Sequence, residues 1–222
     1  MSVTDKLIKK YQEKFDKTIN HPLTKELCNG TLPDKTLYIY LEQDLKFFHV
    51  GLRTILKTTM LAPENDVMMR LAKQVGFLAN AEHGYFEQVL KLLESSIDTK
   101  NTKIPEVLPE VGVYLDFLKN LTTDHSITYE QLITFLWCSE FCYLRWAQIA
   151  EEQKLIPSDL HWKYKEWINL HSGEHFEEWT YFLQAQVDKI NVSKNFADIE
   201  KIFEQTIDLE YKFFESCYTF KF

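Results

Sequence analysis

Glycine, proline and cysteine are all scarce in this sequence of 222 residues, with six, six and four copies. A chain with so few turn-forming residues has little material for the many tight turns of a strand-rich fold. The four cysteines, Cys28, Cys138, Cys142 and Cys217, form no C-x-x-C pair and no spacing typical of a zinc site. A domain of this length needs no disulfide bonds to be stable. We therefore expect a helix-rich protein with reduced thiols.

Long apolar runs and clusters of basic residues are also absent. No run approaches the roughly 20 residues of a membrane-spanning helix, and the opening MSVTDKLIKKYQEK lacks the apolar core of a secretory signal. Lys and Arg number 25 against 33 Asp and Glu, and the two signs are interspersed, whereas nucleic-acid binding requires clustered cations. We expect a soluble, cytoplasmic protein that binds neither nucleic acid nor a membrane.

What the chain does contain is apolar residues at helical spacing along most of its length. In LYIYLEQDLKFFHVGLRTIL they fall on neighbouring turns, together with one acid, Asp44. The pattern predicts helices over 3–18, 23–29, 33–60, 64–94, 107–121, 127–153, 159–187 and 195–218, with SSIDTKNTKIPEVLP as the one long polar connection. Because there is no repeat and no change of composition, residues 1–222 are predicted to form a single all-α helical bundle.

Three acidic residues stand in helical stretches that are otherwise suited to the core. They are Asp44 in YLEQDLKFF, Glu140 in LWCSEFCYLRW and Glu210 in DLEYKFFESCY. A buried carboxylate loses its hydration, so it must find a partner, take up a proton or face outward. One such acid is ordinarily explained by a position at the edge of a buried stripe. Three in one small domain indicate a shared site.

If the three acids meet, neighbouring aromatic residues would wall a pocket for a flat ring. The candidates are Phe47, Phe48, Tyr114, Trp137, Tyr143 and Phe214. Lost hydration and like-charge repulsion raise the pKa of a carboxyl group, which would place a proton donor beside a proton acceptor, as hydrolysis requires. Tyr143 follows Glu140 by three positions, so its hydroxyl is predicted to orient that acid.

At these residues the chain resembles the TenA, or thiaminase II, family, all-helical proteins related in fold to heme oxygenase. HPLTKELCNGTLPDKTLYIYLEQDLKFF, with Gln43 and Asp44, is similar to the amino-terminal signature of the family. LANAEHGYF around Glu82, VYLDFL with Tyr114, YKEWINLHSGEHF, and LEYKFFESCY with Glu210 follow in the order found in the family. The resemblance implies a heme-oxygenase-like bundle that assembles as a homodimer or homotetramer.

The TenA family has two branches that differ on the catalytic helix. One carries a cysteine nucleophile, and the other a glutamate in a pattern like Trp-x-x-Glu-x-x-Tyr. Here WCSEFCY supplies Trp137, Glu140 and Tyr143, so the chain resembles the glutamate branch. The resemblance implies hydrolysis, without a cofactor, of an aminopyrimidine derived from thiamin to the hydroxymethyl compound used in thiamin salvage.

The resemblance also implies roles for single residues. Glu140 and Glu210 would be the acid and the base, and which residue takes which role is open. Asp44 would bind the aminopyrimidine edge of the substrate. Glu82 lies in another family motif and is expected among the substrate-binding residues. His171 stands where the cysteine branch tends to carry tyrosine, so it is placed in the same group and is expected to affect substrate preference.

Three alternatives remain open. Cys138 or Cys142 would be the nucleophile of a thiaminase if the register slipped by two residues, although a buried cysteine is usually an apolar filler. A di-metal bundle requires Glu-x-x-His on two helices, which the chain lacks. Only His171 and His175, four apart, offer a metal-binding pair, and we expect no metal. Finally, the aromatic stripe would be plain core in a TenA-like protein that binds or regulates without catalysis.

Overall fold

Local signals in the sequence set where several helices begin and end. Ser2 and Thr128 each form a capping box, in which the cap side chain accepts a backbone N–H three positions on and that residue bonds back to the cap backbone. The backbone of Gly30 and Gly173 is left-handed, with φ of 76° and 79°. Gly30 ends one helix and Gly173 begins another.

The computed structural model describes residues 1–97 and 104–221. Its elements, in chain order, are α1 (Val3–Lys10), α2 (Gln12–Ile19), α3 (Pro22–Asn29), α4 (Asp34–Met60), α5 (Asn65–Phe77), the π-helical turn η1 (Leu78–Glu82), α6 (His83–Ser96), α7 (Pro109–Thr123), α8 (Tyr129–Glu152), α9 (Trp162–Leu170), α10 (Gly173–Asp188) and α11 (Val192–Thr219). Since these residues contain helices and no strand, the predicted all-α class is confirmed.

Most of the predicted helices agree with the observed ones to within a few residues, and three differ. The predicted helix 3–18 is divided at Tyr11 into α1 and α2. The helix 64–94 is interrupted by η1, and the helix 159–187 is broken between α9 and α10. Each break lies where neither proline nor a long polar stretch marks it, which is why periodicity alone missed it. Part of the predicted polar connection, residues 98–103, lies outside the described residues.

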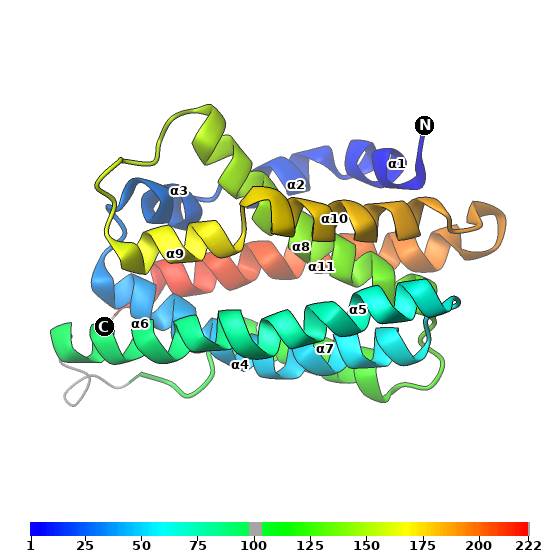
Figure 1. Cartoon of the computed structure of the whole chain (residues 1–222), viewed down its shortest axis with the longest axis horizontal. Coiled ribbons are helices and arrows are strands. Elements are labelled where there is room, and N and C mark those ends of the chain that lie inside the picture. Colours follow the sequence, from blue (N-terminus) through cyan, green and yellow to red (C-terminus); the bar gives the residue numbers. More distant parts are fainter. Residues whose placement is uncertain (98–103, 222) are drawn as a thin grey trace.

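Helices α4, α8 and α11, which carry the three acids singled out in the sequence, run through the interior of the bundle. Helix α8 packs against α10 and α11, and α4 packs against α5, α6 and α7. Figure 1 shows α5 and α6 following one another along one side, with α1, α2 and α3 on the opposite side. Helix α8 also contacts α2, α3 and α4, so it is surrounded by other helices. A helix in such a position buries apolar side chains around most of its circumference, as α8 does.

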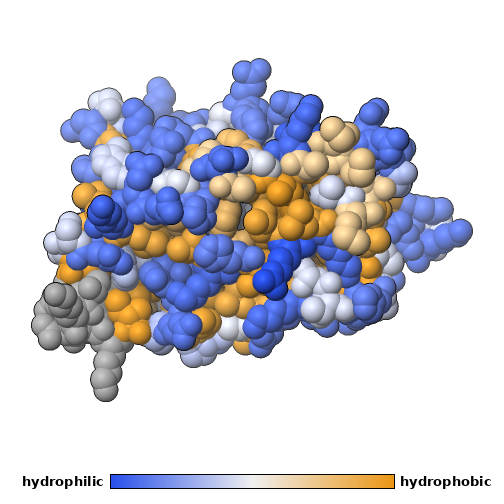
Figure 2. Space-filling view, turned by 60° about the horizontal axis from the view of Figure 1, so that its bottom comes forward, coloured by the Kyte–Doolittle hydropathy of each residue, from blue (hydrophilic) through white to orange (hydrophobic). Residues whose placement is uncertain are grey.

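The surface follows the expected pattern of charged side chains, with one exception. Figure 2 shows hydrophobic side chains gathered on one face of the bundle. The large exposed apolar residues near the end of α4 and the start of α5 are Leu56, Met60, Leu61, Met68 and Met69. In the described part of the chain, no helix combines the length and the apolar character needed to cross a bilayer.

Candidate active site

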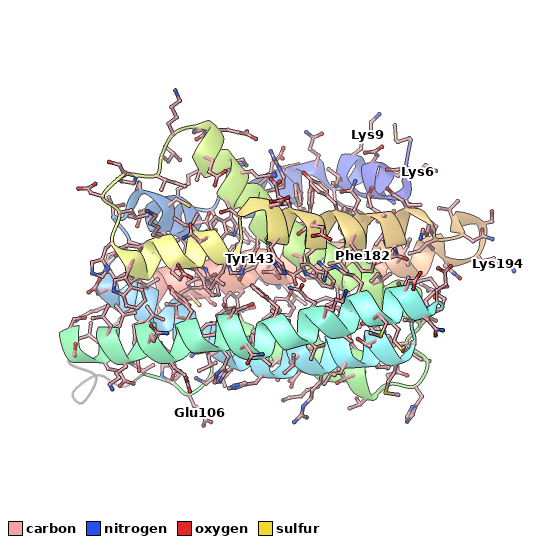
Figure 3. The ribbon with its side chains drawn as sticks, viewed as in Figure 1. Lys6, Lys9, Glu106, Tyr143, Phe182 and Lys194 are labelled. Carbon is pink, nitrogen blue, oxygen red and sulfur yellow. The ribbon has the colours of Figure 1, made fainter. Side chains whose placement is uncertain are left out.

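One cavity collects three carboxylic acids from three different elements. Asp44 of α4, Glu82 of η1 and Glu140 of α8 all line a cavity of about 80 Å³, which is large enough for several water molecules. The remaining lining residues are Phe47, Phe48, Gly51, Leu52, Ile55, Leu78, Phe135, Leu136, Ser139, Tyr143 and His171. Figure 3 shows Tyr143 in the interior, while Lys6, Lys9 and Lys194 lie at the periphery. The cavity is therefore apolar except for its acids and a few hydroxyl and ring groups.

Asp44 and Glu140 are carboxyl groups that retain protons near neutral pH. Burial raises the pKa of Asp44 to about 8 and that of Glu140 to about 7. Asp44 is 5% exposed, and within residues 1–97 and 104–221 its pKa is raised by burial alone, with no hydrogen bond to its carboxyl group. The indole N–H of Trp179 lies near Glu140 and lowers its pKa, although the geometry falls short of a hydrogen bond. Sequence reasoning did not find Trp179, because it lies 39 positions from Glu140.

Glu210 of α11 belongs to the same electrostatic cluster but does not line the cavity. It is 1% exposed, and the Tyr114 hydroxyl donates a hydrogen bond of 2.6 Å to its Oε1 atom. Burial and the nearby carboxylates of Asp44 and Glu140 raise the pKa of Glu210 to about 8, while the Tyr114 bond opposes that rise. The three acids identified from the sequence are therefore close enough to affect one another's protonation.

Glu82 ends a π-helical turn, η1, and lines the cavity. In such a turn the backbone bonds run from residue i to i+5, so it winds more widely than an α-helix. Leu78 and Glu82, at its two ends, both line the cavity. Burial and repulsion from Glu140 and Asp44 raise the pKa of Glu82 well above its usual range. Glu82 is thus a third acid in the cavity, where the sequence had placed it only among binding residues.

The hydroxyl of Tyr143 is bonded differently from what the sequence predicted. The Tyr40 hydroxyl donates to Tyr143 at 3.2 Å, and the Trp167 indole N–H donates to the Tyr40 oxygen at 3.2 Å. The prediction that the Tyr143 hydroxyl orients Glu140 is therefore wrong. Burial and the charge of Asp44 raise the pKa of Tyr143 well above its usual range. Its hydroxyl keeps its hydrogen, and since it accepts from Tyr40, that hydrogen is available to a ligand.

His171 lines the cavity as a neutral ring. It caps the carboxyl end of α9, and its Nδ1 atom lies 2.9 Å from the Trp167 carbonyl oxygen, to which Nδ1–H donates. Burial lowers the pKa of His171 to about 4. The rings of Trp167 and Tyr143 pack against it, with centroids 4.3 and 4.7 Å away. A neutral ring protonated on Nδ1 leaves Nε2 as a hydrogen-bond acceptor.

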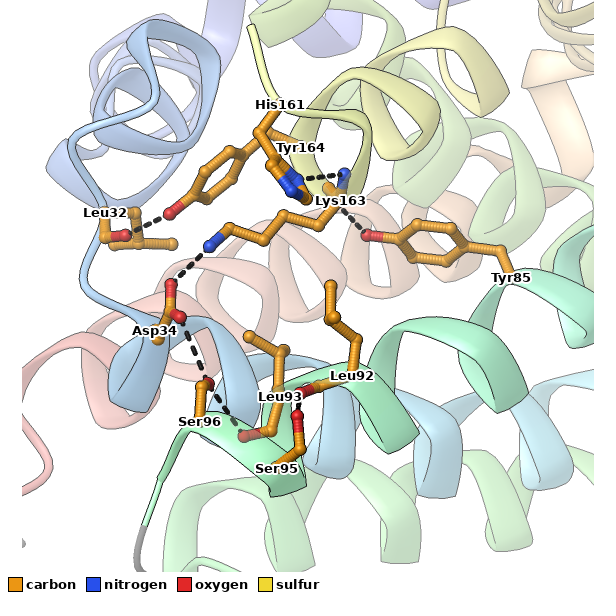
Figure 4. A network of polar contacts seen from close by, with 10 residues as sticks. All are labelled: Leu32, Asp34, Tyr85, Leu92, Leu93, Ser95, Ser96, His161, Lys163 and Tyr164. Atoms are coloured by element: carbon orange, nitrogen blue, oxygen red, sulfur yellow. Dashed lines mark hydrogen bonds and ion pairs between the residues drawn. The ribbon is translucent and has the colours of Figure 1, made fainter.

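A polar network fixes the start of α9 and so helps to place His171 at its other end. Lys163 forms an ion pair with Asp34 at 2.6 Å, and the Tyr164 hydroxyl donates to the Leu32 carbonyl at 2.6 Å (Figure 4). The Tyr85 hydroxyl donates to the Lys163 carbonyl at 2.5 Å. These bonds join α9 to the start of α4, which lines the cavity further along, and to α6, which follows η1.

Three of the predicted aromatic residues lie outside the cavity lining. Trp137 stacks between Phe141 and Phe203, with centroid distances of 5.6 and 5.4 Å, and belongs to the core. Phe214 packs against Tyr143, at 5.8 Å, behind the lining. Tyr114 lies behind the lining, where it bonds to Glu210 and packs against Phe47 with ring centroids 4.8 Å apart, whereas Phe47, Phe48 and Tyr143 do line the cavity.

Sequence reasoning missed the lining residues Phe135, Leu136 and Ser139 on α8. Leu136 stands four positions before Glu140 and therefore shares its helical face, which was the available signal. The alternative nucleophiles lie elsewhere. Cys138 and Cys142, two positions from Glu140 in either direction, are completely buried outside the lining.

The thiol of Cys138 is in an unreactive setting. Its Sγ atom lies 3.8 Å from the Phe203 carbonyl oxygen, and burial raises its pKa well above the usual range. A thiol must ionise to act as a nucleophile, so this environment opposes that role.

The histidine pair considered for a metal is divided by the fold. His171 is buried, whereas His175 is exposed and packs against Phe77 with a centroid distance of 4.3 Å. Within the part of the chain that the structure describes, no three His, Cys, Asp or Glu side chains are arranged to hold a metal ion.

Comparison with known proteins places the chain in a family. The model of the TENA/THI-4/PQQC family matches residues 8–219. A TenA homologue from Pyrococcus horikoshii OT3 superposes with a TM-score of 0.81 at 20% identity, covering 98% of this chain and 99% of that one.

Two further solved structures are similar in fold. A TenA family transcription regulator from Silicibacter sp. TM1040 gives a TM-score of 0.76 at 16% identity, with 98% and 96% coverage of this chain and that one. A putative TenA-like thiaminase from Sulfolobus solfataricus P2 gives a TM-score of 0.73 at 16% identity, covering 96% of this chain and 94% of that one. No curated protein matches the sequence. Since the family model covers nearly the whole chain, this protein belongs to the TENA/THI-4/PQQC family.

Proposed function

We propose that this protein hydrolyses aminopyrimidines derived from thiamin, converting an aminomethyl substituent to a hydroxymethyl group for thiamin salvage. The supporting observation is one cavity lined by Asp44 and Glu140, with Glu210 in electrostatic reach, in which burial keeps carboxyl groups protonated near neutral pH. Hydrolysis at neutral pH needs a proton donor and a proton acceptor together, and carboxyl groups with pKa values near 7 serve both roles.

The cavity walls suit a flat aminopyrimidine ring. Phe47 and Phe48 provide aromatic surface, and Asp44 would accept hydrogen bonds from the ring amino group. The free hydrogen of Tyr143 would be donated to a ring nitrogen, and Nε2 of His171 would accept from the substrate. These contacts would hold the aminomethyl carbon in a fixed position relative to Glu140.

In the proposed reaction the bond between the aminomethyl carbon and nitrogen breaks, and a bond from that carbon to a water oxygen forms. One carboxylate takes a proton from the water, and one carboxylic acid gives a proton to the departing amine, which leaves as ammonia. Glu140 lines the cavity and is one of the pair; Glu210 lies behind the lining and is the other, acting through one intervening water, while the Tyr114 bond favours its charged form. The limb of the kcat/KM profile that moves when Tyr114 is replaced by Phe assigns the acid and the base.

The test is turnover of aminomethyl aminopyrimidine by the purified protein, measured as ammonia and as hydroxymethyl product. Glu140→Gln and Glu210→Gln are expected to lower kcat by about 100-fold or more, the usual scale for losing a general acid or base. Glu151→Gln, at an exposed position on the same helix as Glu140, is the matched control and should leave kcat unchanged. Absence of turnover by the unaltered protein contradicts the proposal.

Thiamin cleavage through a cysteine is the first alternative. It is less well supported, because Cys138 and Cys142 are buried outside the cavity lining. Non-catalytic binding or regulation is the second, and one similar structure is described as a transcription regulator. Binding of the aminopyrimidine in calorimetry with no release of ammonia would favour this second alternative.

We also propose that the protein acts in the cytoplasm as a homodimer or homotetramer. All four cysteines are free and buried, as is usual for proteins of a reducing compartment. The resemblance to the TenA family supports the assembly. Light scattering across a range of protein concentrations tests it, and a monomer throughout that range would contradict it.

A further inference from the structure

The cavity contains acids and no cation to balance them. Asp44, Glu82 and Glu140 line it, and no lysine or arginine is among the lining residues that the structure describes. Its one basic group, His171, is neutral, since burial lowers its pKa to about 4. An apolar cavity with three carboxyl groups has a strong preference for any positive charge that enters it.

The acids of the cavity interact with one another and not with protein cations. Burial, and after it repulsion from Glu140 and Asp44, raises the pKa of Glu82 and that of Glu210. In the empty cavity these groups therefore hold protons. Asp44 is only 5% exposed, and it lines the cavity. Its carboxyl group has no hydrogen-bond partner among the described residues. A buried carboxyl group with no partner in the described chain indicates that the partner is a ligand.

Glu82 is the acid that lies in the π-helical turn η1, at its last residue. Segments of π-helix are rare and occur often at functional sites. Each residue of an α-helix turns the chain by about 100°, so a wider turn re-aims every side chain that follows it. Within η1, Ala79, Asn80 and Ala81 are exposed, while Leu78 and Glu82 line the cavity. This turn therefore carries a carboxyl group that faces a cavity already lined by two other acids.

We propose that Glu82 makes the cavity select a cationic amine over the neutral hydroxyl compound of the same shape. The consequence of this selection rests on the proposed function: the enzyme would retain its aminomethyl substrate and release its hydroxymethyl product. An ammonium group that enters the cavity takes the place of protons on the acids, which pass to the solvent. The product has no charge to replace them and is held less tightly.

The groups around Glu82 determine the pH dependence of this selection. Asp44 of α4 and Glu140 of α8 lie close enough to raise its pKa, and neutral His171 at the end of α9 lines the same cavity. The next residue in the chain is His83. The centroid of its ring lies 6.0 Å from the ring centroid of His49, and His49 is exposed.

On α4 the nearby cation Lys46 is paired with Glu42, four positions away, and is not a lining residue. Because raising the pH ionises the lining acids, preference for the cation should grow from about pH 6 to about pH 8, while an alkyl ammonium remains charged.

The test uses a matched pair of unreactive probes, benzylamine and benzyl alcohol, which differ in charge but hardly in shape. Dissociation constants are measured by NMR titration of the whole protein. We expect benzylamine to bind at least about tenfold more tightly than benzyl alcohol at about pH 8, with a smaller ratio at about pH 6. Calorimetry in buffers of different ionisation enthalpy should show proton release with benzylamine and none with benzyl alcohol.

Two variants assign the selection to Glu82. Glu82→Gln should reduce the ratio of the two dissociation constants by about tenfold. Glu87→Gln makes the same chemical change at an exposed position on α6 and should leave it unaltered. If Glu82→Gln does not fold, Glu82→Ala takes its place with the same expected loss, and absence of proton release from the unaltered protein also overturns the proposal. Equal binding of the two probes by the unaltered protein, or an unchanged ratio in folded Glu82→Gln, overturns the proposal.

The outcome is separable from that of the proposed function. Turnover of aminomethyl aminopyrimidine together with equal binding of the two probes would leave the hydrolase standing and remove the charge selection. Selective binding of benzylamine without turnover would leave a cation-binding cavity and remove the hydrolase. With both correct, the hydroxymethyl product should inhibit only at concentrations well above the KM of the substrate.

Discussion

The hydroxyl of Tyr114 donates a 2.6 Å hydrogen bond to Glu210 where both side chains are only 1% exposed. The bond joins α7 to α11 and lowers the pKa of Glu210, while burial and the acids Asp44 and Glu140 raise it to about 8. The protonation of Glu210 is therefore a balance between burial and two neighbouring carboxyl groups, which favour the neutral form, and one donor, which favours the charged form. Removing the donor should shift that balance in a known direction.

Tyr114→Phe should raise the pKa of Glu210, because the carboxylate loses the hydrogen bond that favours its charged form. If Glu210 acts as the base, the acidic limb of the kcat/KM profile should move to higher pH by about one unit. If it acts as the acid, the basic limb should move in the same direction. Steady-state kinetics across pH gives the measurement.

The control for this variant is Tyr129→Phe, which removes a buried hydroxyl that has no hydrogen-bond partner at the start of α8. It should change neither the profile nor the stability appreciably. A profile for Tyr114→Phe identical to that of the unaltered protein would show that the bond does not tune the reaction.

Stability should fall as the pH rises from about 7 to about 8. The folded-state pKa values of Asp44, Glu140 and Glu210, about 8, 7 and 8, lie above their unfolded values, so the folded protein binds more protons in this range. Their contribution is complete below about pH 4 and is lost as the pH rises through the folded values. The free energy of unfolding should decrease by about 1.4 kcal/mol per pH unit for each proton of difference.

Denaturant unfolding at several pH values tests this slope. Histidines with lowered pKa values, such as His171 at about 4, reduce stability only as the pH falls below about 6.5, outside the chosen range. Asp44→Asn should flatten the slope, and Asp116→Asn at an exposed position should not. A free energy of unfolding that is constant or rises between about pH 7 and about pH 8 contradicts the prediction.

His171 should remain neutral, with its proton on Nδ1, down to about pH 4, because its ring is buried and donates to the Trp167 carbonyl. Nitrogen-15 NMR of the imidazole rings distinguishes the two tautomers and the charged form. His171→Phe identifies the signal by its loss. Titration of that signal at about pH 6.5, the value of a free histidine, would show that the ring is solvated.

The four cysteines should react slowly with a thiol reagent in the native protein and rapidly after unfolding, since all are buried. Cys138→Ala and Cys142→Ala should keep kcat for aminopyrimidine hydrolysis within about threefold, although each leaves a small cavity in the core. Loss of activity in either variant, with Glu140→Gln still active, would restore the cysteine mechanism.

The sequence predicted the helices that matter most for this site, but it could not predict how their side chains are bonded. Helix α8 was expected over 127–153 and is observed as Tyr129–Glu152, because its apolar periodicity and its capping box are local signals. The partner of Tyr143 is Tyr40, 103 positions away, and not Glu140, which shares its helix. Spacing on one helix shows which side chains share a face, while the hydrogen bonds depend on which helix covers that face.

The sequence by itself determined the all-α class, the long helices and the unusual placing of Asp44, Glu140 and Glu210 among aromatic residues, since all three follow from composition and period. Only the tertiary structure decided that Asp44 and Glu140 line one cavity, that Glu210 lies behind it with Tyr114, and that Trp137 belongs to the core. The tertiary structure also showed that Glu82 ends a π-helical turn and lines the same cavity. The physical reason is that burial and charge repulsion act between elements far apart in the chain, and their strength depends on distances that no local pattern contains.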